Sequence, residues 1–172
     1  AEVTLISGPT AIEPPMFVNV IPIISAQEMF EKVATNATEN DIIIKAAAVA
    51  DYRPKEVCDE KIKKSDHDTE IELERTTDIL AYLGKNKGKT FLCGFSMETE
   101  NMLENSRRKL DKKNLDMIVA NNLKDKGAGF GVDTNLITII TRDRELQLEL
   151  MSKQDAANCI LDEIIRKIGN RE

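Results

Sequence analysis

The sequence lacks a long apolar run, a histidine cluster and any closely paired cysteines, and each absence excludes a class of protein. No apolar run approaches the ~20 residues that a helix needs to cross a bilayer, so we expect no membrane segment. No Cys-x-x-Cys motif or histidine cluster indicates a metal site. The single histidine, His67, lies between acidic residues, where we expect a surface role. No Ser-His-Asp or Cys-His arrangement indicates covalent hydrolytic catalysis.

Positively charged residues are fewer than negatively charged ones. Lysine and arginine number 24 against 30 acidic residues, and the net charge of −6 argues against nucleic acid or an anionic membrane as a partner. A phosphate-bearing substrate needs only a few lysines placed locally, so it stays compatible with this charge. The three cysteines, Cys58, Cys93 and Cys159, are odd in number and widely spaced. The last two lie in apolar segments and are typical of small core residues, which favours a reducing, cytoplasmic setting.

What the chain does contain is the composition of an ordinary globular domain. Its 172 residues are 41% apolar and 31% charged, which predicts one domain over residues 1–172. Apolar runs alternate with helical patterns, as in an α/β fold with a mainly parallel sheet. We expect strands at 3–7, 17–23, 41–49, 70–73, 91–95 and 115–120, helices from Ser25, Thr76, Glu100 and Ser152, and a hairpin of 136–141 with 146–151.

Three local expectations are specific enough to check. The run Ile42-Ile43-Ile44 shows no alternation, which predicts a strand covered on both faces. Residues 51–68 read as a charged loop. The last helix is expected to bury Ala157, Ile160, Leu161, Ile164 and Ile168 on one face.

Polar segments follow the expected strands at the positions where α/β sheets bind ligands. The first begins at Asp51 and leads to a lysine cluster, Lys61, Lys63 and Lys64. Such a cluster suits a polyphosphate, but a solvated charge run explains it equally well at this point. The second is 96–100, and the third is 120–122, followed by Gly127-Ala128-Gly129-Phe130-Gly131. Because the glycines lead toward a strand and open no helix, they predict a mobile loop or lid and not a dinucleotide fingerprint.

These segments together resemble the phosphopantothenoylcysteine synthetase family. The matching stretches occur in family order and cover nearly the whole chain. They are Val3–Pro9, Ala46–Arg53, Glu60–Lys64, Asp78-Ile79, Gly94-Phe95, Glu98-Thr99, Lys113–Asp116, Ala120-Asn121 and Gly129-Phe130. The resemblance implies a Rossmann-like α/β fold: a mainly parallel sheet with helices on both faces and a C-terminal β-hairpin.

The resemblance also implies a two-step ligation that belongs to coenzyme A biosynthesis. The carboxylate of 4′-phosphopantothenate attacks the α-phosphate of CTP in the presence of Mg²⁺, and pyrophosphate leaves. The amine of cysteine then attacks the acyl-cytidylate and expels CMP. It further implies a homodimer and, in bifunctional members, fusion to a decarboxylase domain that carries FMN. Relatives outside bacteria use ATP, so the choice between CTP and ATP stays open.

The resemblance assigns nucleotide contacts to twelve positions and a metal ligand to none. The positions are Lys45, Ala46, Ala47, Asp51, Lys61, Thr77, Asp78, Ile79, Leu80, Phe95, Lys109 and Lys113. Among them, Lys61 matches the lysine that serves the triphosphate and the reaction, and Phe95 matches an aromatic that packs on the nucleotide. Lys109 and Lys113 match two basic contacts.

The sequence departs from the family pattern at two places, and the first departure leads to an alternative function. Members place a strand-loop-helix unit before the residues that match Val3, so we expect this first unit to be absent here. A nucleotide-binding and dimerising module without ligase activity is therefore the main alternative. The family's Ala-Asn-Asp is Ala120-Asn121-Asn122, which leaves the role of Asn122 open. A dinucleotide-dependent oxidoreductase is disfavoured because no Gly-x-Gly-x-x-Gly opens a helix.

Overall fold

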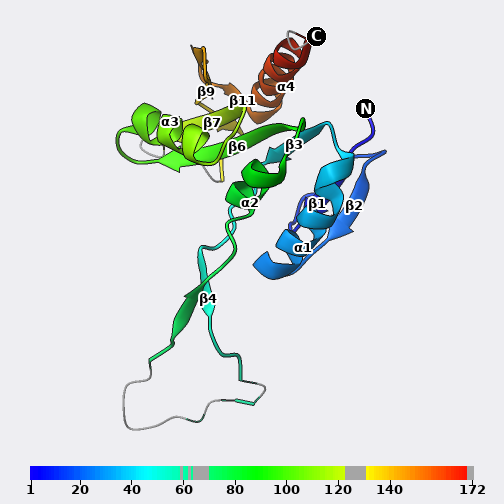
Figure 1. Cartoon of the computed structure of the whole chain (residues 1–172), viewed down its shortest axis with the longest axis vertical. Coiled ribbons are helices and arrows are strands. Elements are labelled where there is room, and N and C mark those ends of the chain that lie inside the picture. Colours follow the sequence, from blue (N-terminus) through cyan, green and yellow to red (C-terminus); the bar gives the residue numbers. More distant parts are fainter. Residues whose placement is uncertain (59, 62, 64–69, 123–130, 170–172) are drawn as a thin grey trace. The chain divides into compact units, whose positions relative to one another are not determined.

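The computed structural model describes residues 1–58, 60–61, 63, 70–122 and 131–169 of the chain. The chain divides into two compact units, which are described separately below. Unit 1 comprises Ala1–Thr35 and Ala47–Ile79, and unit 2 comprises Asn36–Ala46 and Leu80–Glu172. Figure 1 labels the helices and strands of both units. Within the described ranges, no helix combines the length and the apolar character that crossing a bilayer requires.

Unit 1 opens with two short parallel strands and a helix. Strand β1 (Thr4–Ser7) pairs with β2 (Asn19–Pro22), and α1 (Ala26–Asn36) follows. The predicted helix start at Ser25 is confirmed. Its Oγ accepts the backbone N–H of Glu28 at 3.2 Å, and the Glu28 carboxylate in turn accepts the N–H of residue 24 at 3.0 Å. The first of these bonds satisfies a donor that the first helical turn would otherwise leave unpaired, and the second ties Glu28 to the backbone just before the cap.

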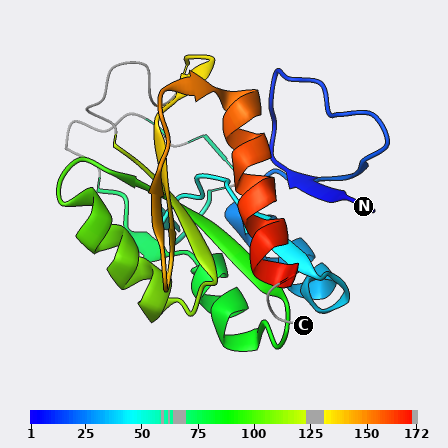
Figure 2. The same ribbon diagram turned by 90° about the horizontal axis from the view of Figure 1, so that it is seen from above.

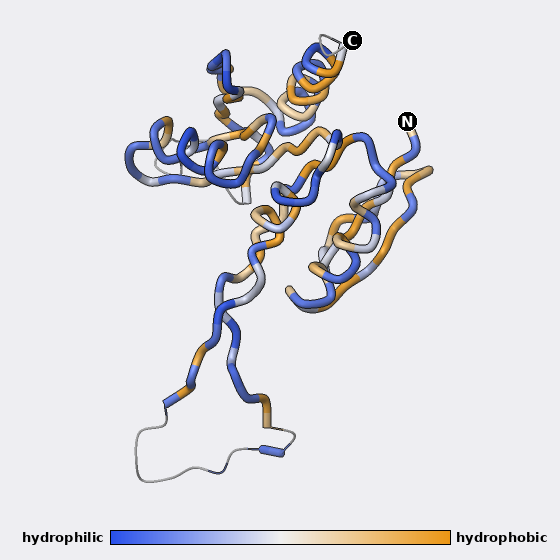
Figure 3. Tube along the Cα trace, in the orientation of Figure 1, coloured by the Kyte–Doolittle hydropathy of each residue, from blue (hydrophilic) through white to orange (hydrophobic). Residues whose placement is uncertain are grey.

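Unit 1 also contains a two-stranded antiparallel ribbon. Strand β4 (Tyr52–Pro54) pairs with β5 (Leu73–Arg75), so the prediction of a loop over 51–68 was wrong at its beginning. The Arg53 guanidinium donates to the Glu74 carboxylate at 2.7 Å across the two strands. Opposite charges on facing residues favour this pairing. The strand predicted at 70–73 overlaps β5 only at Leu73. Figure 3 shows the ribbon mostly in hydrophilic colours, with a few hydrophobic residues between them.

Unit 2 is built on a mixed five-stranded sheet in the order β10-β9-β7-β6-β3. The strands are β3 (Ile42–Lys45), β6 (Phe91–Glu98), β7 (Met117–Asn122), β9 (Ile137–Thr141) and β10 (Glu145–Gln147). The pairs β3–β6 and β6–β7 are parallel, whereas β7–β9 and β9–β10 are antiparallel. The predicted Rossmann-like α/β fold with a C-terminal hairpin is confirmed, with a mixed sheet in this unit. Three short elements complete the description: η1 (Ala37–Glu39), β8 (Thr134–Asn135) and β11 (Met151–Ser152).

Helices cover both faces of this sheet, as predicted. Helix α4 (Lys153–Gly169) packs on the face that carries Phe91, Cys93, Met117 and Val119. The opposite face meets α2 (Ile79–Asn86) and α3 (Met102–Lys112), where the Leu80 side chain touches Gly94. Figure 2 shows α3 and α4 on opposite sides of the strands. Because side chains alternate along a strand, odd-numbered residues of β6 face α4 and even-numbered residues face α2 and α3.

The burial of α4 corrects the expected core face. Ala156, Ile160 and Ile164 are its buried apolar residues, at a spacing of four. Ala157 is exposed and Leu161 is 46% exposed, so their predicted burial was wrong. The predicted burial of Ile160 and Ile164 is confirmed. Ala157 and Leu161 each follow a buried residue, and one residue corresponds to a rotation of about 100° around the helix axis, which turns them away from the sheet.

Strand β3 also differs from the expectation. Ile42 and Ile44 are 37% and 41% exposed, and the strand ends at Lys45 instead of continuing to Val49. Among the described residues, β3 pairs only with β6 and forms the edge of its sheet. An edge strand has a neighbour on one side only, so the alternate isoleucines stay partly accessible.

Candidate functional site

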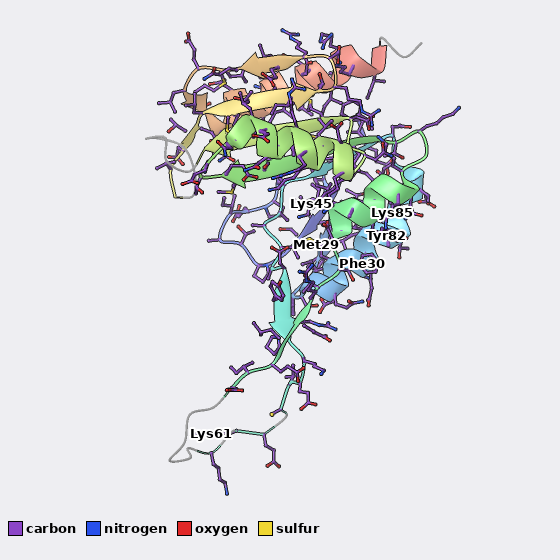
Figure 4. The ribbon with its side chains drawn as sticks, turned by 60° about the vertical axis from the view of Figure 1, so that its left-hand side comes forward. Met29, Phe30, Lys45, Lys61, Tyr82 and Lys85 are labelled. Carbon is purple, nitrogen blue, oxygen red and sulfur yellow. The ribbon has the colours of Figure 1, made fainter. Side chains whose placement is uncertain are left out.

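Three parallel strands of unit 2 end at one edge of its sheet. Strand β3 ends at Lys45 opposite Gly94, while β6 and β7 continue until Glu98 pairs with Asn122. The carboxyl edge of parallel strands is where α/β domains place ligands. Figure 4 labels Lys45 at this strand end and shows Tyr82 and Lys85 on α2.

Lys109 reaches this edge from α3. Its Nζ donates to Glu98 Oε1 at 2.6 Å and to the Ser96 hydroxyl at 3.4 Å. Ser96 donates to the same carboxylate oxygen at 2.8 Å, and Asn105 Nδ2 donates to the other one at 3.3 Å. One predicted phosphate contact is therefore held in a network of four side chains.

Glu98 is the charged centre of that network. Its side chain is 14% exposed, and burial alone would raise the pKa of the carboxyl group. Hydrogen bonds from Lys109, Ser96 and Asn105, together with the charge of Lys109, outweigh burial and lower this pKa. The carboxylate is thus negative at neutral pH, and the ion pair with Lys109 is complete.

Lys113 is placed by the junction of α2 and α3. It is the C-cap of α3, and its N–H donates to the carbonyl of Lys109 at 3.0 Å. A Cβ added to Gly84 would lie 1.8 Å from the Lys113 carbonyl oxygen, so α2 approaches this backbone as closely as glycine allows. The next residue, Asn114, has a left-handed φ of 50° and donates from Nδ2 to the Gly84 carbonyl at 2.8 Å. This contact sets the direction of the chain at Lys113.

The apolar predicted contacts are less accessible than the lysines. Ile79 and Leu80 are 2% and 6% exposed, so a nucleotide could meet their backbone but not their side chains. Phe95 is half-buried and packs against the core beneath α4. It therefore faces the opposite side of the sheet from Lys109, and only a ligand beyond the strand end could reach both.

Unit 1 brings Asp51 close to the segment that starts α2. The Thr76 hydroxyl donates to the carbonyl of Ala50 at 2.5 Å, and its N–H donates to the carbonyl of Asp51 at 3.0 Å. These bonds close the base of the β4–β5 ribbon and place Thr77 and Asp78, both exposed, one and two residues from Thr76. Two separate stretches of predicted contacts thus become neighbours.

The small residues of the alanine segment are also exposed. Ala46, in unit 2, and Ala47, in unit 1, leave the end of β3 without regular structure. Short side chains at exposed positions allow a ligand to come close to the backbone.

Lys61 lies on the segment that joins β4 to β5, at the opposite end of the ribbon from Asp51. It is exposed, and Figure 4 shows its side chain pointing away from the ribbon. Unit 1 therefore does not bring Lys61 to Asp51 within one chain. Lys63 is described and exposed. Lys64, His67 and the glycines at 127 and 129 lie outside the described residues.

Glu98 and Ser96 are the residues whose roles sequence reasoning missed. Residues 96–100 read as a polar loop, whereas β6 continues through Glu98. The alternation of Ser96 and Glu98 on one face, thirteen and eleven residues before Lys109, was the available signal. In the part of the chain that the structure describes, no group of three histidine, cysteine or acidic residues could hold a metal ion.

The fold and the polar strand ends define a Rossmann-like α/β domain with a ligand edge. The family model of the "DNA/pantothenate metabolism flavoprotein C-terminal domain" matches residues 1–168. The chain belongs to this family, which confirms the assignment made from its motifs.

Named relatives agree with this assignment. The chain is 48% identical over 166 residues to the "Coenzyme A biosynthesis bifunctional protein CoaBC" of Bacillus subtilis, covering 95% of the chain and 41% of that protein. It is 41% identical to the protein of the same name from Haemophilus influenzae, covering 97% of the chain and 42% of the relative. The chain thus spans less than half the length of these relatives.

A solved structure extends the likeness to three dimensions. The crystal structure of the C-terminal domain of "Coenzyme A biosynthesis bifunctional protein CoaBC" superposes with a TM-score of 0.81 at 44% identity, covering 98% of this chain and 77% of that one. The "DNA/Pantothenate Metabolism Flavoprotein" from Streptococcus pneumoniae has a TM-score of 0.79 at 19% identity, covering 96% of this chain and 81% of that one, and shows the shared fold alone.

Proposed function

We propose that residues 1–172 form a phosphopantothenate–cysteine ligase domain of coenzyme A biosynthesis, which uses CTP to activate 4′-phosphopantothenate. The observation that carries the proposal is the placement of Lys109 beside the carboxyl edge of a Rossmann-like sheet, in a chain that belongs to the pantothenate-metabolism family. Relatives named for coenzyme A biosynthesis support the same reaction.

The chemical difficulty of this reaction is that two anions must meet. A carboxylate attacks a triphosphate, and their repulsion has to be offset before the reacting atoms can approach. Positioned cations at the place where charge develops stabilise such a transition state most effectively. Lys109, Lys113 and Lys61 supply this charge in the proposal, whereas Lys45 contacts the nucleotide through its backbone. Lys61 is the one that acts directly on the triphosphate during acyl-cytidylate formation.

The remaining assigned residues hold the nucleotide in the proposal. The backbone at Ala46 and Ala47 approaches it closely, and Asp51 accepts hydrogen bonds from its polar groups. Residues 77–80 lie at a helix start, where backbone N–H groups and the helix dipole favour an anionic ligand. Phe95 packs against the part of the nucleotide that extends beyond the strand end.

Mg²⁺ fits this site as a companion of the triphosphate. The described residues offer no cluster of three acidic or histidine ligands. In nucleotide sites Mg²⁺ commonly keeps several waters and takes one or two carboxylates plus phosphate oxygens, so such a cluster is not required. When bound, the ion neutralises phosphate charge.

A homodimer is part of the proposal, and the β4–β5 ribbon supports it. Tyr52 and Leu73 are 50% and 56% exposed, and Ile71 and Val57, nearer the far end, are 69% and 84% exposed. A lone two-stranded ribbon is marginally stable in water, and a second copy could cover this apolar surface. A dimer would also offer Lys61 a site on the partner chain, away from its own Asp51.

The wider setting follows from the bifunctional relatives. Because the chain spans 41% of the Bacillus subtilis protein, whose name includes "bifunctional", we place a decarboxylase domain with FMN elsewhere in the same polypeptide. The cytoplasm is the proposed location.

Calorimetry with CTP and Mg²⁺, followed by a turnover assay with 4′-phosphopantothenate and cysteine, tests the function. We expect CTP to bind more tightly than ATP and to release pyrophosphate only when 4′-phosphopantothenate is present. Binding without turnover in the full-length protein would favour a nucleotide-binding module instead. Binding of NADH without binding of CTP would favour an oxidoreductase.

A further inference from the structure

Glu98 places a negative charge beside a proposed triphosphate site, which calls for an explanation. A carboxylate near a triphosphate repels it. Glu98 nevertheless accepts hydrogen bonds from three side chains, those of Ser96, Asn105 and Lys109. A group held by so many partners has a fixed position.

We propose that Glu98 is a positioning residue, which holds the ammonium group of Lys109 at the carboxyl end of β6 in the geometry that receives a nucleotide phosphate. The inference rests on the proposed function, because it takes the ligand to be a nucleoside triphosphate.

The exposure of the two partners supports this role. The Glu98 side chain is 14% exposed and that of Lys109 is 45% exposed, so a ligand that approaches from solvent meets the lysine first. A lysine ammonium group has three N–H donors. Bonds to Glu98 and Ser96 use two of them, which leaves one for a phosphate oxygen without breaking the ion pair.

Fixing the lysine in advance lowers the entropy lost on binding. A lysine side chain has four rotatable bonds, and immobilising such a chain opposes ligand binding. The hydrogen bonds from Lys109 to Glu98 and Ser96 supply this ordering from within the protein. Removing the Glu98 charge should therefore weaken CTP binding about three- to tenfold, the range expected for ordering one long side chain.

The test compares Glu98→Gln, Lys109→Ala and the double variant in the full-length protein, with CTP and Mg²⁺ in calorimetry. Glu98→Gln should raise the Kd for CTP three- to tenfold in the wild-type background and change it less than twofold in the Lys109→Ala background. Glu145→Gln is the matched control, because it removes the same charge from an ion pair with Arg107 on the same helix, at 2.6 Å. It should leave the Kd unchanged.

A spectroscopic measurement separates positioning from general damage to the fold. The paired ammonium of Lys109 should give a slowly exchanging ¹⁵N–¹H signal in the wild type that disappears in Glu98→Gln while the unfolding midpoint is retained. Unchanged or tighter CTP binding by Glu98→Gln would overturn the inference, since Glu98 would then merely oppose the triphosphate. An equal loss in the Lys109→Ala background would overturn it too. Absence of CTP binding by the wild type would instead refute the proposed function.

Discussion

Replacing Gly84 with alanine should destabilise the protein, although alanine favours helices. The new Cβ would lie 1.8 Å from the carbonyl oxygen and 2.8 Å from the carbonyl carbon of Lys113. Both atoms belong to the backbone, so no change of rotamer can relieve the contact. Overpacking of this kind costs about 3 kcal/mol, and the helical preference of alanine offsets about 1 kcal/mol. We therefore expect a net loss of about 2 kcal/mol.

Urea unfolding followed by circular dichroism measures this loss. Gly169→Ala is the matched control, since Gly169 also lies in a helix and no atom comes within 4 Å of its added Cβ. The control should change the free energy of unfolding by less than about 0.5 kcal/mol. A Gly84→Ala protein as stable as the wild type would refute the close approach of α2 to Lys113. The variant should also bind CTP more weakly, because the Lys113 backbone must move.

Three further predictions concern single side chains. Ser106→Ala should raise the free energy of unfolding by about 1 kcal/mol in urea, because the buried Oγ has no hydrogen-bond partner in the described structure; a loss of stability would contradict this. Arg166 holds the pKa of Glu163 below its ordinary value. The ion pair therefore stabilises the fold above pH ~4.3, the ordinary pKa of a glutamate. This contribution disappears as the pH falls through the lowered pKa. Between pH 7 and pH 3, Glu163→Gln should therefore lose less stability than the wild type, and parallel curves would speak against the pair. Burial raises the pKa of Cys93 to about 12, so a thiol reagent at pH 8 should modify the exposed Cys58 and leave Cys93 intact until the protein unfolds.

Local signals predicted the helix starts well. Ser152, like Ser25, forms the hydrogen bonds expected of a cap: its Oγ accepts the N–H of Asp155 at 3.0 Å and donates to the carboxylate at 2.6 Å. These contacts span three residues, so the sequence contains all the partners. The same holds for the strand cores, whose apolar runs are continuous.

Features that depend on distant partners were harder to predict. The ribbon strands β4 and β5 are joined by pairs such as Arg53 with Glu74, twenty-one residues apart. Complementary charge at mirrored positions was the signal that could have revealed them. The burial of Ile42 depends on which strands lie beside β3, and the burial of Leu161 depends on how α4 turns toward the sheet. Neither is encoded in the local pattern.

The candidate site was predictable as a set of residues but not as a geometry. The family motif marks Lys109 and Phe95, yet only the alternation along β6 places them on opposite faces. Glu98 belongs to a motif whose role became visible through the hydrogen bonds it accepts.

In the proposed function, Lys61, on the segment that joins β4 to β5, promotes formation of an acyl-cytidylate from CTP. The most direct measurement is pyrophosphate release from CTP and 4′-phosphopantothenate by the full-length protein and its Lys61→Gln variant, at saturating CTP. Loss of one positioned charge contact of this kind costs about 3 kcal/mol, so we predict a rate roughly a hundredfold lower with the fold retained. Equal rates of pyrophosphate release by the two proteins would contradict this role of Lys61.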